Sequence, residues 1–247
     1  MHFKIFLKLY PLSFGEFITA TVGRRFAELL DSQDYPMITS FKQTYIDALR
    51  QYFFVGGMPE AVQNFAKEKE FNEVREIQKR ILTAYEQDFS KHAPIEIVPK
   101  IRMIWNSIPS QLAKENKKFI YGLIREGSRA KEFETAIMWL CDCGLVHKVS
   151  RVNKAEIPLK AYEDLGIYYY TNDRGSCEVD FILDTGRRIV PVEVKAEVNL
   201  KAKSLKTYRE KFNPEICIRT SMADYKKEDW LLNLPLYAIP FFSCNTL

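Results

Sequence analysis

The sequence predicts a mixed α+β protein, and two patterns lead to that fold class. In the first half, apolar residues recur at the 3.6-residue spacing of amphipathic helices. In the second half, short runs rich in β-branched residues alternate apolar with polar side chains and are separated by turn residues. A length of 247 residues exceeds one typical domain. The aromatic fraction of 13% favours several small cores.

Composition narrows the class of protein further. The formal net charge of +4 is mild, so it permits contact with nucleic acid without indicating it. Five cysteines lack a second ligand pair at zinc spacing, and we interpret them as reduced, mostly buried thiols. No stretch approaches eighteen consecutive apolar residues, and residues 1–12 are too interrupted by Lys and Pro for a signal peptide. We therefore expect a cytoplasmic protein that does not enter a membrane.

The N-terminal third is predicted to be helical. In residues 1–31, Pro11 fits the first turn of a helix that continues through Phe17 and Ile18. Residues 32–96 contain three apolar stripes at helical spacing, over 41–53, 61–65 and 71–89. Gly56 and Gly57 could cradle an anion, but a turn between two helices is the more common role of such a pair.

Residues 97–163 are predicted to form a winged helix-turn-helix. We expect a helix over 98–108, a short helix from Pro109 or Ser110, and a third from Ser128 to Gly144. Strands at 145–152 and 157–162 would form the wing. Lys100 to Lys160 holds roughly twelve basic against six acidic residues. The basic residues expected to meet DNA phosphates are Arg125, Arg129, Lys131, Lys148, Arg151 and Lys154.

Residues 164–247 are predicted to form a small α/β domain around a β-hairpin. We expect a strand at 167–171, the hairpin, a helix over 199–212, a strand at 216–220 and a closing segment from Trp230. Turn residues at 184–188 separate the two hairpin strands. Folding about the centre of that turn sets Asp180 opposite Glu193 and Glu178 opposite Lys195. Strict alternation would turn Val179, Phe181 and Leu183 to the other face.

This arrangement would suit a divalent cation. Asp180 and Glu193, with the carbonyl of Val194, could hold Mg²⁺, while Lys195 could orient or help deprotonate a water molecule. Glu178 is a lesser candidate, either as a ligand of a second metal ion or as a residue that contacts the ligands of the first. The alternative is a solvent-facing hairpin in which Glu178 and Lys195 form an ordinary cross-strand pair.

The spacing D-x12-E-x-K over residues 180–195 resembles the core of the PD-(D/E)xK nuclease superfamily. The phrases at 9–17, 53–62, 168–180 and 192–197 are similar to those of bacterial and archaeal AAA-type ATPases that end in a DUF4143 region. That resemblance implies an ATPase followed by a helical segment, a winged helix and a restriction-endonuclease-like domain. It also implies DNA as a partner and Asp180, Glu193 and Lys195 as catalytic residues.

The sequence departs from this pattern in two ways. It contains no G-x-x-x-x-G-K-[ST], so we expect no ATP to be bound and no ATPase activity. It also lacks a helical stretch after Leu165, which would supply another acid and cover the sheet. Exposed apolar surface there favours a homo-oligomer or another partner. A further hypothesis is a subunit that docks on an intact ATPase through residues 1–31. The predicted function is that of a DNA-associated remnant of an ATPase–nuclease chain with Mg²⁺-dependent phosphodiester hydrolysis. The alternative is a non-catalytic winged-helix module that binds DNA or protein.

Overall fold

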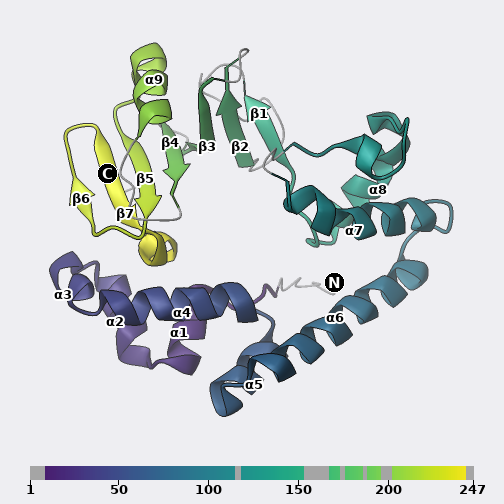
Figure 1. Ribbon diagram of the computed structural model, residues 1–247, viewed down its shortest axis with the longest axis horizontal. Helices are drawn as coiled ribbons and strands as arrows, with labels where there is room; N and C mark the ends of the chain where they lie inside the picture. Colours follow the sequence, from purple (N-terminus) through teal and green to yellow (C-terminus); the bar gives the residue numbers. More distant parts are fainter. Residues whose placement is uncertain are drawn as a thin grey trace, which may run out of the picture. The chain divides into compact units, whose positions relative to one another are not determined.

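The computed structural model describes residues 9–114, 118–152, 167–172, 176–185, 188–195 and 202–242. The described part is mixed α+β, which confirms the predicted fold class (Figure 1). The chain divides into two compact units, one made of Met1–Ile77 with Val149–Leu247 and the other of Gln78–Lys148. Among the helices described, none combines the length and apolar character needed to cross a bilayer.

The first unit begins with a run of helices. They are α1 (Phe14–Thr21), α2 (Arg24–Ser32), α3 (Tyr35–Ser40), α4 (Lys42–Val55), α5 (Pro59–Glu68) and the start of α6 (Phe71–His92). The last three confirm the apolar stripes predicted to be helical. The prediction for Pro11 was wrong, because α1 starts three residues later at a capping box. There the Ser13 hydroxyl accepts from the Glu16 amide, and the Glu16 carboxylate accepts from the Ser13 amide at 2.7 Å.

Gly56 and Gly57 lie between α4 and α5, so the predicted turn between helices is confirmed. The turn also contacts the segment before α1. The Leu12 amide donates to the carbonyl oxygen of Gly57 at 2.7 Å, and the hydroxyl of Tyr52 donates to the carbonyl of Leu12 at 2.8 Å. A Cβ atom on Gly57 would overlap the Leu12 carbonyl oxygen. This glycine is therefore required for the close approach of two backbones.

The rest of the first unit is a sheet with one helix along it. The described strands are β1 (Val149–Val152), β2 (Ile167–Thr171), β3 (Glu178–Asp184), β4 (Ile189–Val194), β5 (Cys217–Ser221), β6 (Lys226–Lys227) and β7 (Leu231–Pro235). They lie in the order β1-β2-β3-β4-β5-β7-β6. β4, β5 and β7 are parallel to one another, as are β1 and β2, whereas β3 is antiparallel to both of its neighbours. The predicted strands at 167–171 and 216–220 are confirmed by β2 and β5.

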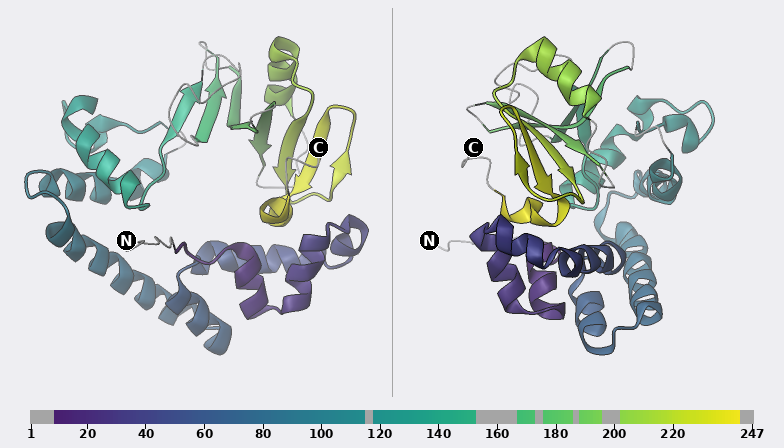
Figure 2. Two further views of the ribbon diagram at one scale, coloured as in Figure 1. Left: turned by 180° about the vertical axis from the view of Figure 1, so that it is seen from behind. Right: turned by 60° about the vertical axis from the view of Figure 1, so that its left-hand side comes forward.

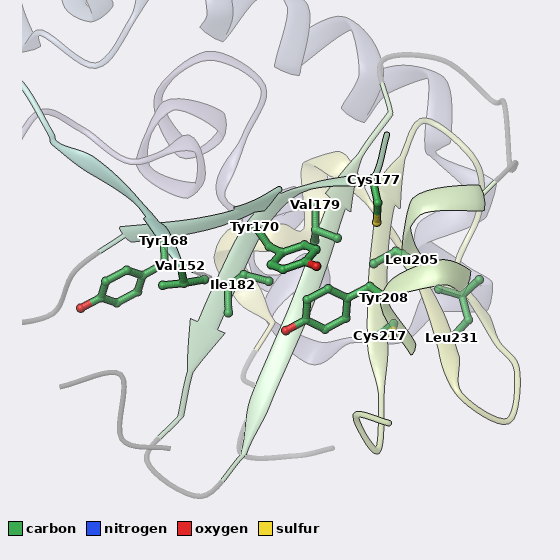
Figure 3. Close-up of a cluster of buried hydrophobic side chains, with 10 residues drawn as sticks. All are labelled: Val152, Tyr168, Tyr170, Cys177, Val179, Ile182, Leu205, Tyr208, Cys217 and Leu231. Carbon is green, nitrogen blue, oxygen red and sulfur yellow. The ribbon is translucent and has the colours of Figure 1, made fainter. Parts of the chain in front are cut away.

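Helix α9 (Lys203–Phe212) covers a core that spans most of this sheet (Figures 1 and 2). Leu205 and Tyr208 extend from α9 into the cluster, and Tyr208 meets the ring of Tyr170 edge-on with centroids 5.0 Å apart (Figure 3). The cluster also contains Val152, Tyr168, Cys177, Val179, Ile182, Cys217 and Leu231. The apolar side chains of several strands and of one helix thus form a single continuous core.

A 3-10 helix, η3 (Leu236–Phe241), joins the sheet to the N-terminal helices within the first unit. The ring of Tyr237 stacks on that of Tyr45 with centroids 5.2 Å apart. Just before β6, the Tyr225 ring stacks on Tyr35 at 3.8 Å. The adjacent Asp224 forms an ion pair with Lys42 at 2.7 Å.

The second unit contains the remainder of α6, α7 (Val98–Leu112), η1 (Tyr121–Leu123) and α8 (Ala130–Asp142), around an apolar cluster of their buried side chains. Two boundaries differ from the prediction. α7 continues through Pro109, because its last turn carries Gln111, whose side-chain amide binds both backbone groups of Ile120. α8 begins after Arg129 and not at Ser128, because Glu132 accepts from the Arg129 amide at 3.2 Å.

The predicted wing is only partly described. Its first strand is β1, which pairs in parallel with β2 and so belongs to the sheet of the first unit. The second predicted strand, at 157–162, and Lys154 lie outside the described residues. The winged helix therefore stays a prediction.

The four cysteines in the described part form no disulfide with one another, and two of them are buried. Cys177 and Cys217 are buried, Cys141 is half-buried and Cys143 is exposed. Cys244 lies outside the described residues.

Candidate metal centre

The hairpin has the register that the sequence predicts. Phe181 pairs with Val192, Leu183 with Val190, and Asp184 with Ile189. The Thr185 amide donates to the carbonyl of Arg188 at 3.1 Å and closes the turn. One step beyond the first of these pairs, on the side away from the turn, Asp180 comes beside Glu193.

The sequence predicts that side chains along β3 point strictly alternately to the two faces of the sheet, and this prediction was wrong at residues 180 and 181. On the side of β2, Tyr170 pairs with Val179 but Tyr168 pairs with Ile182, so two residues of β3 face one residue of β2. This is a β-bulge at residues 180 and 181. It turns Val179 and Ile182 into the same core and leaves Phe181 and Leu183 exposed.

The two predicted carboxylates meet at the end of the hairpin. Asp180 Oδ2 accepts a hydrogen bond of 2.9 Å from the backbone amide of Val194. Glu193 is 4% exposed, and its Oε1 lies 2.5 Å from Lys195 Nζ. The structure thus brings Asp180, Glu193, Val194 and Lys195 together.

The second oxygen of Glu193 has an unusual environment. Glu193 Oε2 is buried, and no donor in the described structure hydrogen-bonds to it. A buried carboxylate oxygen without a partner costs free energy of about 1–3 kcal/mol or more, and such groups are usually satisfied by water or an ion. This oxygen fits a divalent cation as its partner.

Glu178 does not complete a larger acidic cluster. It is exposed at the start of β3. In the described residues, no three side chains of the types His, Cys, Asp and Glu lie close enough together to hold a metal ion. Two carboxylates remain compatible with Mg²⁺, which keeps several waters and is commonly bound by one or two carboxylates together with substrate phosphates.

Sequence reasoning missed Arg219 and Asn233, which extend this site across the sheet. In the register of the sheet, Glu193 on β4 lies next to Arg219 on β5, and Arg219 lies next to Asn233 on β7. All three side chains are buried, and Arg219 Nε donates to Asn233 Oδ1 at 3.0 Å. The signal in the sequence was a single charged residue inside a strand whose other residues are uncharged, because a buried charge requires a partner.

Two families of known sequences match parts of this chain. Residues 46–176, just over half of the chain, match the family described as "Domain of unknown function (DUF8612)". The chain belongs to the DUF8612 family. Residues 156–239, which include β2 to β7 and α9, match a further domain of unknown function, DUF4143, as the sequence predicted. No curated protein and no solved structure matches the chain.

The DUF8612 match contains the basic residues predicted to meet DNA, and the structure distributes them over both units. Arg125, Arg129, Lys131 and Lys148 belong to the second unit and are exposed. Arg125 forms an ion pair with Glu132 at 2.8 Å. Arg151 lies on β1 in the first unit, where its guanidinium donates to the carbonyl of Thr171 at 3.0 Å.

Proposed function

We propose that the DUF4143 part of this chain is a nuclease-like domain of the PD-(D/E)xK type that hydrolyses phosphodiester bonds in DNA with Mg²⁺. The observation that carries the proposal is the buried carboxylate of Glu193. One of its oxygens is bound to Lys195, and the other has no hydrogen-bond partner among the described residues, while Asp180 lies alongside. A solvent-facing hairpin with ordinary cross-strand pairs would not bury one of these acids.

Each residue then has a defined role. Asp180 and Glu193 would hold the ion, and the carbonyl of Val194 could supply a further oxygen ligand. When bound, Mg²⁺ lowers the pKa of a bound water and offsets negative charge on the phosphoryl group. The ammonium of Lys195, fixed by Glu193, would orient the attacking water, favour loss of the water's proton to solvent through its positive charge, and stabilise negative charge in the transition state.

We propose the same lineage for the protein as a whole. The phrases shared with AAA-type ATPases and the DUF4143 match support descent from an ATPase–nuclease chain. The partners that follow are DNA and an ATPase subunit or a second copy of this chain. Affinity capture of the full chain from its source cell, with an ATPase as the expected prey, tests this part.

The catalytic proposal is tested by nicking of supercoiled plasmid in the presence of Mg²⁺ or Mn²⁺. We expect Lys195→Ala and Glu193→Gln each to lower the rate about 100-fold or more, since each removes a group that acts on the reacting phosphate or its ion. Lys67→Ala and Glu68→Gln, at exposed positions of α5, are matched controls and should cleave like the wild type.

Two results would reject a nuclease. One is the absence of nicking with either ion by protein whose fold is verified. The other is equal nicking by wild type and Lys195→Ala, which would point to a contaminating enzyme. Salt-dependent DNA binding that persists in Asp180→Ala without any cleavage would favour the non-catalytic binding module.

A further inference from the structure

A row of buried polar side chains crosses three parallel strands. Glu193 on β4, Arg219 on β5 and Asn233 on β7 are successive partners in the register. Residues paired on neighbouring strands project from the same face of a sheet. A carboxylate, a guanidinium and an amide therefore lie side by side, and each residue is at most 4% exposed.

Asn233 fixes this row in position. Its Oδ1 accepts from Arg219 Nε at 3.0 Å and from the Ser221 hydroxyl at 2.9 Å. Its Nδ2 donates to the carbonyls of Ala223 and Asp224 at 3.3 and 2.7 Å. All four hydrogen-bonding positions of the amide are used, so its orientation is defined and Arg219 is held beside Glu193.

Charge at the site is balanced without a metal ion. Among the described side chains that the register places here, Asp180 and Glu193 contribute two negative charges, and Lys195 and Arg219 contribute two positive charges. Burial lowers the pKa of Arg219, and the negative charges of Glu228 and then of Glu193 oppose that lowering. Glu228, which acts in the same direction, is itself paired with Lys226 at 2.7 Å.

Counted over these four described side chains, the site offers a divalent ion no net negative charge. In proteins Mg²⁺ is usually held by one or two carboxylates together with waters and the phosphates of a substrate. Here the missing negative charge has an obvious source, because a phosphodiester brings one charge and the oxygen ligands that Mg²⁺ prefers.

We propose that Arg219 sets the metal affinity of this site, so that the divalent ion binds tightly only together with a phosphate of the DNA. This inference rests on the proposed nuclease function and assigns Arg219 a role within it. Arg219 is buried and does not touch the DNA; it acts through its charge beside Glu193. The consequence is a nuclease that stays unloaded until substrate arrives.

The proposal predicts that loss of the Arg219 charge raises the affinity of the site for a divalent ion. Removing a positive charge from beside a divalent ion strengthens binding of the ion, because charges in a partly buried site are weakly screened. For Arg219→Gln we expect Mn²⁺ to bind about tenfold more tightly, or better, in the absence of DNA. A purely structural role of Arg219 would produce the opposite change.

Mn²⁺ binding can be measured from the electron paramagnetic resonance signal of the free ion, with and without a phosphorothioate duplex that resists cleavage. For the wild type we expect the duplex to tighten Mn²⁺ binding about tenfold or more. Arg219→Gln keeps a donor for Asn233 but loses the charge, and it should bind tightly without the duplex. Arg219→Lys keeps the charge and should behave like the wild type. The double variant Asp180→Asn/Glu193→Gln, measured with the duplex, is the control for Mn²⁺ that binds to the DNA and not to the protein.

Each outcome decides the matter. If the folded Arg219→Gln variant binds Mn²⁺ no more tightly than the wild type, the role of Arg219 is refuted even though the nuclease stands. If Arg219→Gln does not fold, the wild-type comparison suffices, since equal affinity with and without the duplex overturns the coupling. If the wild type binds no Mn²⁺ in either condition and does not nick DNA, the proposed function fails and this inference fails with it.

Discussion

A methyl group added at Gly57 should loosen the attachment of the segment before α1. The Cβ of alanine would overlap the carbonyl oxygen of Leu12 and lie 2.9 Å from its nitrogen. Both obstacles are backbone atoms, so they cannot move aside by a change of rotamer. The segment at residues 11 and 12 must therefore shift away from the turn.

The cost can be estimated from the contacts that would be lost. The shift breaks the hydrogen bond from the Leu12 amide to Gly57 and the bond from Tyr52 to the Leu12 carbonyl. At about 1 kcal/mol each, with about 1 kcal/mol or more for local strain, the free energy of unfolding should fall by about 2–4 kcal/mol. Gly122→Ala is the matched control, because nothing lies within 4 Å of its added Cβ.

Urea unfolding followed by circular dichroism measures the loss, and hydrogen exchange of the Leu12 amide locates it. We expect this amide to exchange faster in Gly57→Ala and unchanged in Gly122→Ala. A Gly57→Ala protein within about 0.5 kcal/mol of the wild type, with normal protection at Leu12, would show that the close approach is not required.

Two further predictions concern α1 and the cysteines. Ser13→Ala should destabilise the protein by about 1 kcal/mol at pH 7. Hydrogen bonds from the Ser13 amide and hydroxyl lower the pKa of Glu16, so the part of this stabilisation that the carboxylate contributes is present above the ordinary carboxyl pKa and is lost as the pH falls through the lowered value. Urea titrations should therefore show the penalty shrinking below about pH 4 to the part that comes from the bond between the Glu16 amide and the Ser13 hydroxyl, and the absence of any penalty at pH 7 would contradict the cap. In native protein, iodoacetamide should label the exposed Cys143 but not Cys217, where burial raises the pKa to about 12, and peptide mapping that shows equal labelling would contradict this burial.

Local chemistry in the sequence was sufficient to predict the hairpin. Turn residues at 184–188 and the alternating runs on either side define a pairing in which Asp180 approaches Glu193, and the observed register agrees. The pairing depends only on neighbouring residues, so no knowledge of the rest of the fold is needed. The apolar stripes of α4 to α6 were predictable for the same reason.

The features that the sequence did not predict depend on distant partners. The bulge in β3 follows from its pairing with β2, and nothing within β3 itself specifies that an extra residue is accommodated there. The role of Arg219 follows from the order β4-β5-β7, which places it between Glu193 and Asn233. The starts of α1 and α8 were misplaced because the capping side chains of Glu16 and Glu132 decided between adjacent candidates.

Because of the extra residue in β3, its pairing with β2 should tolerate insertions and deletions that its pairing with β4 should not. On the β4 side, pairing is regular up to Phe181, and any slip would carry Asp180 away from Glu193. On the β2 side, the irregularity can absorb a shift of one position. Insertions or deletions in the connection between β2 and β3 should therefore be accepted without loss of the carboxylate pair, whereas the same changes at the turn between β3 and β4 should separate it.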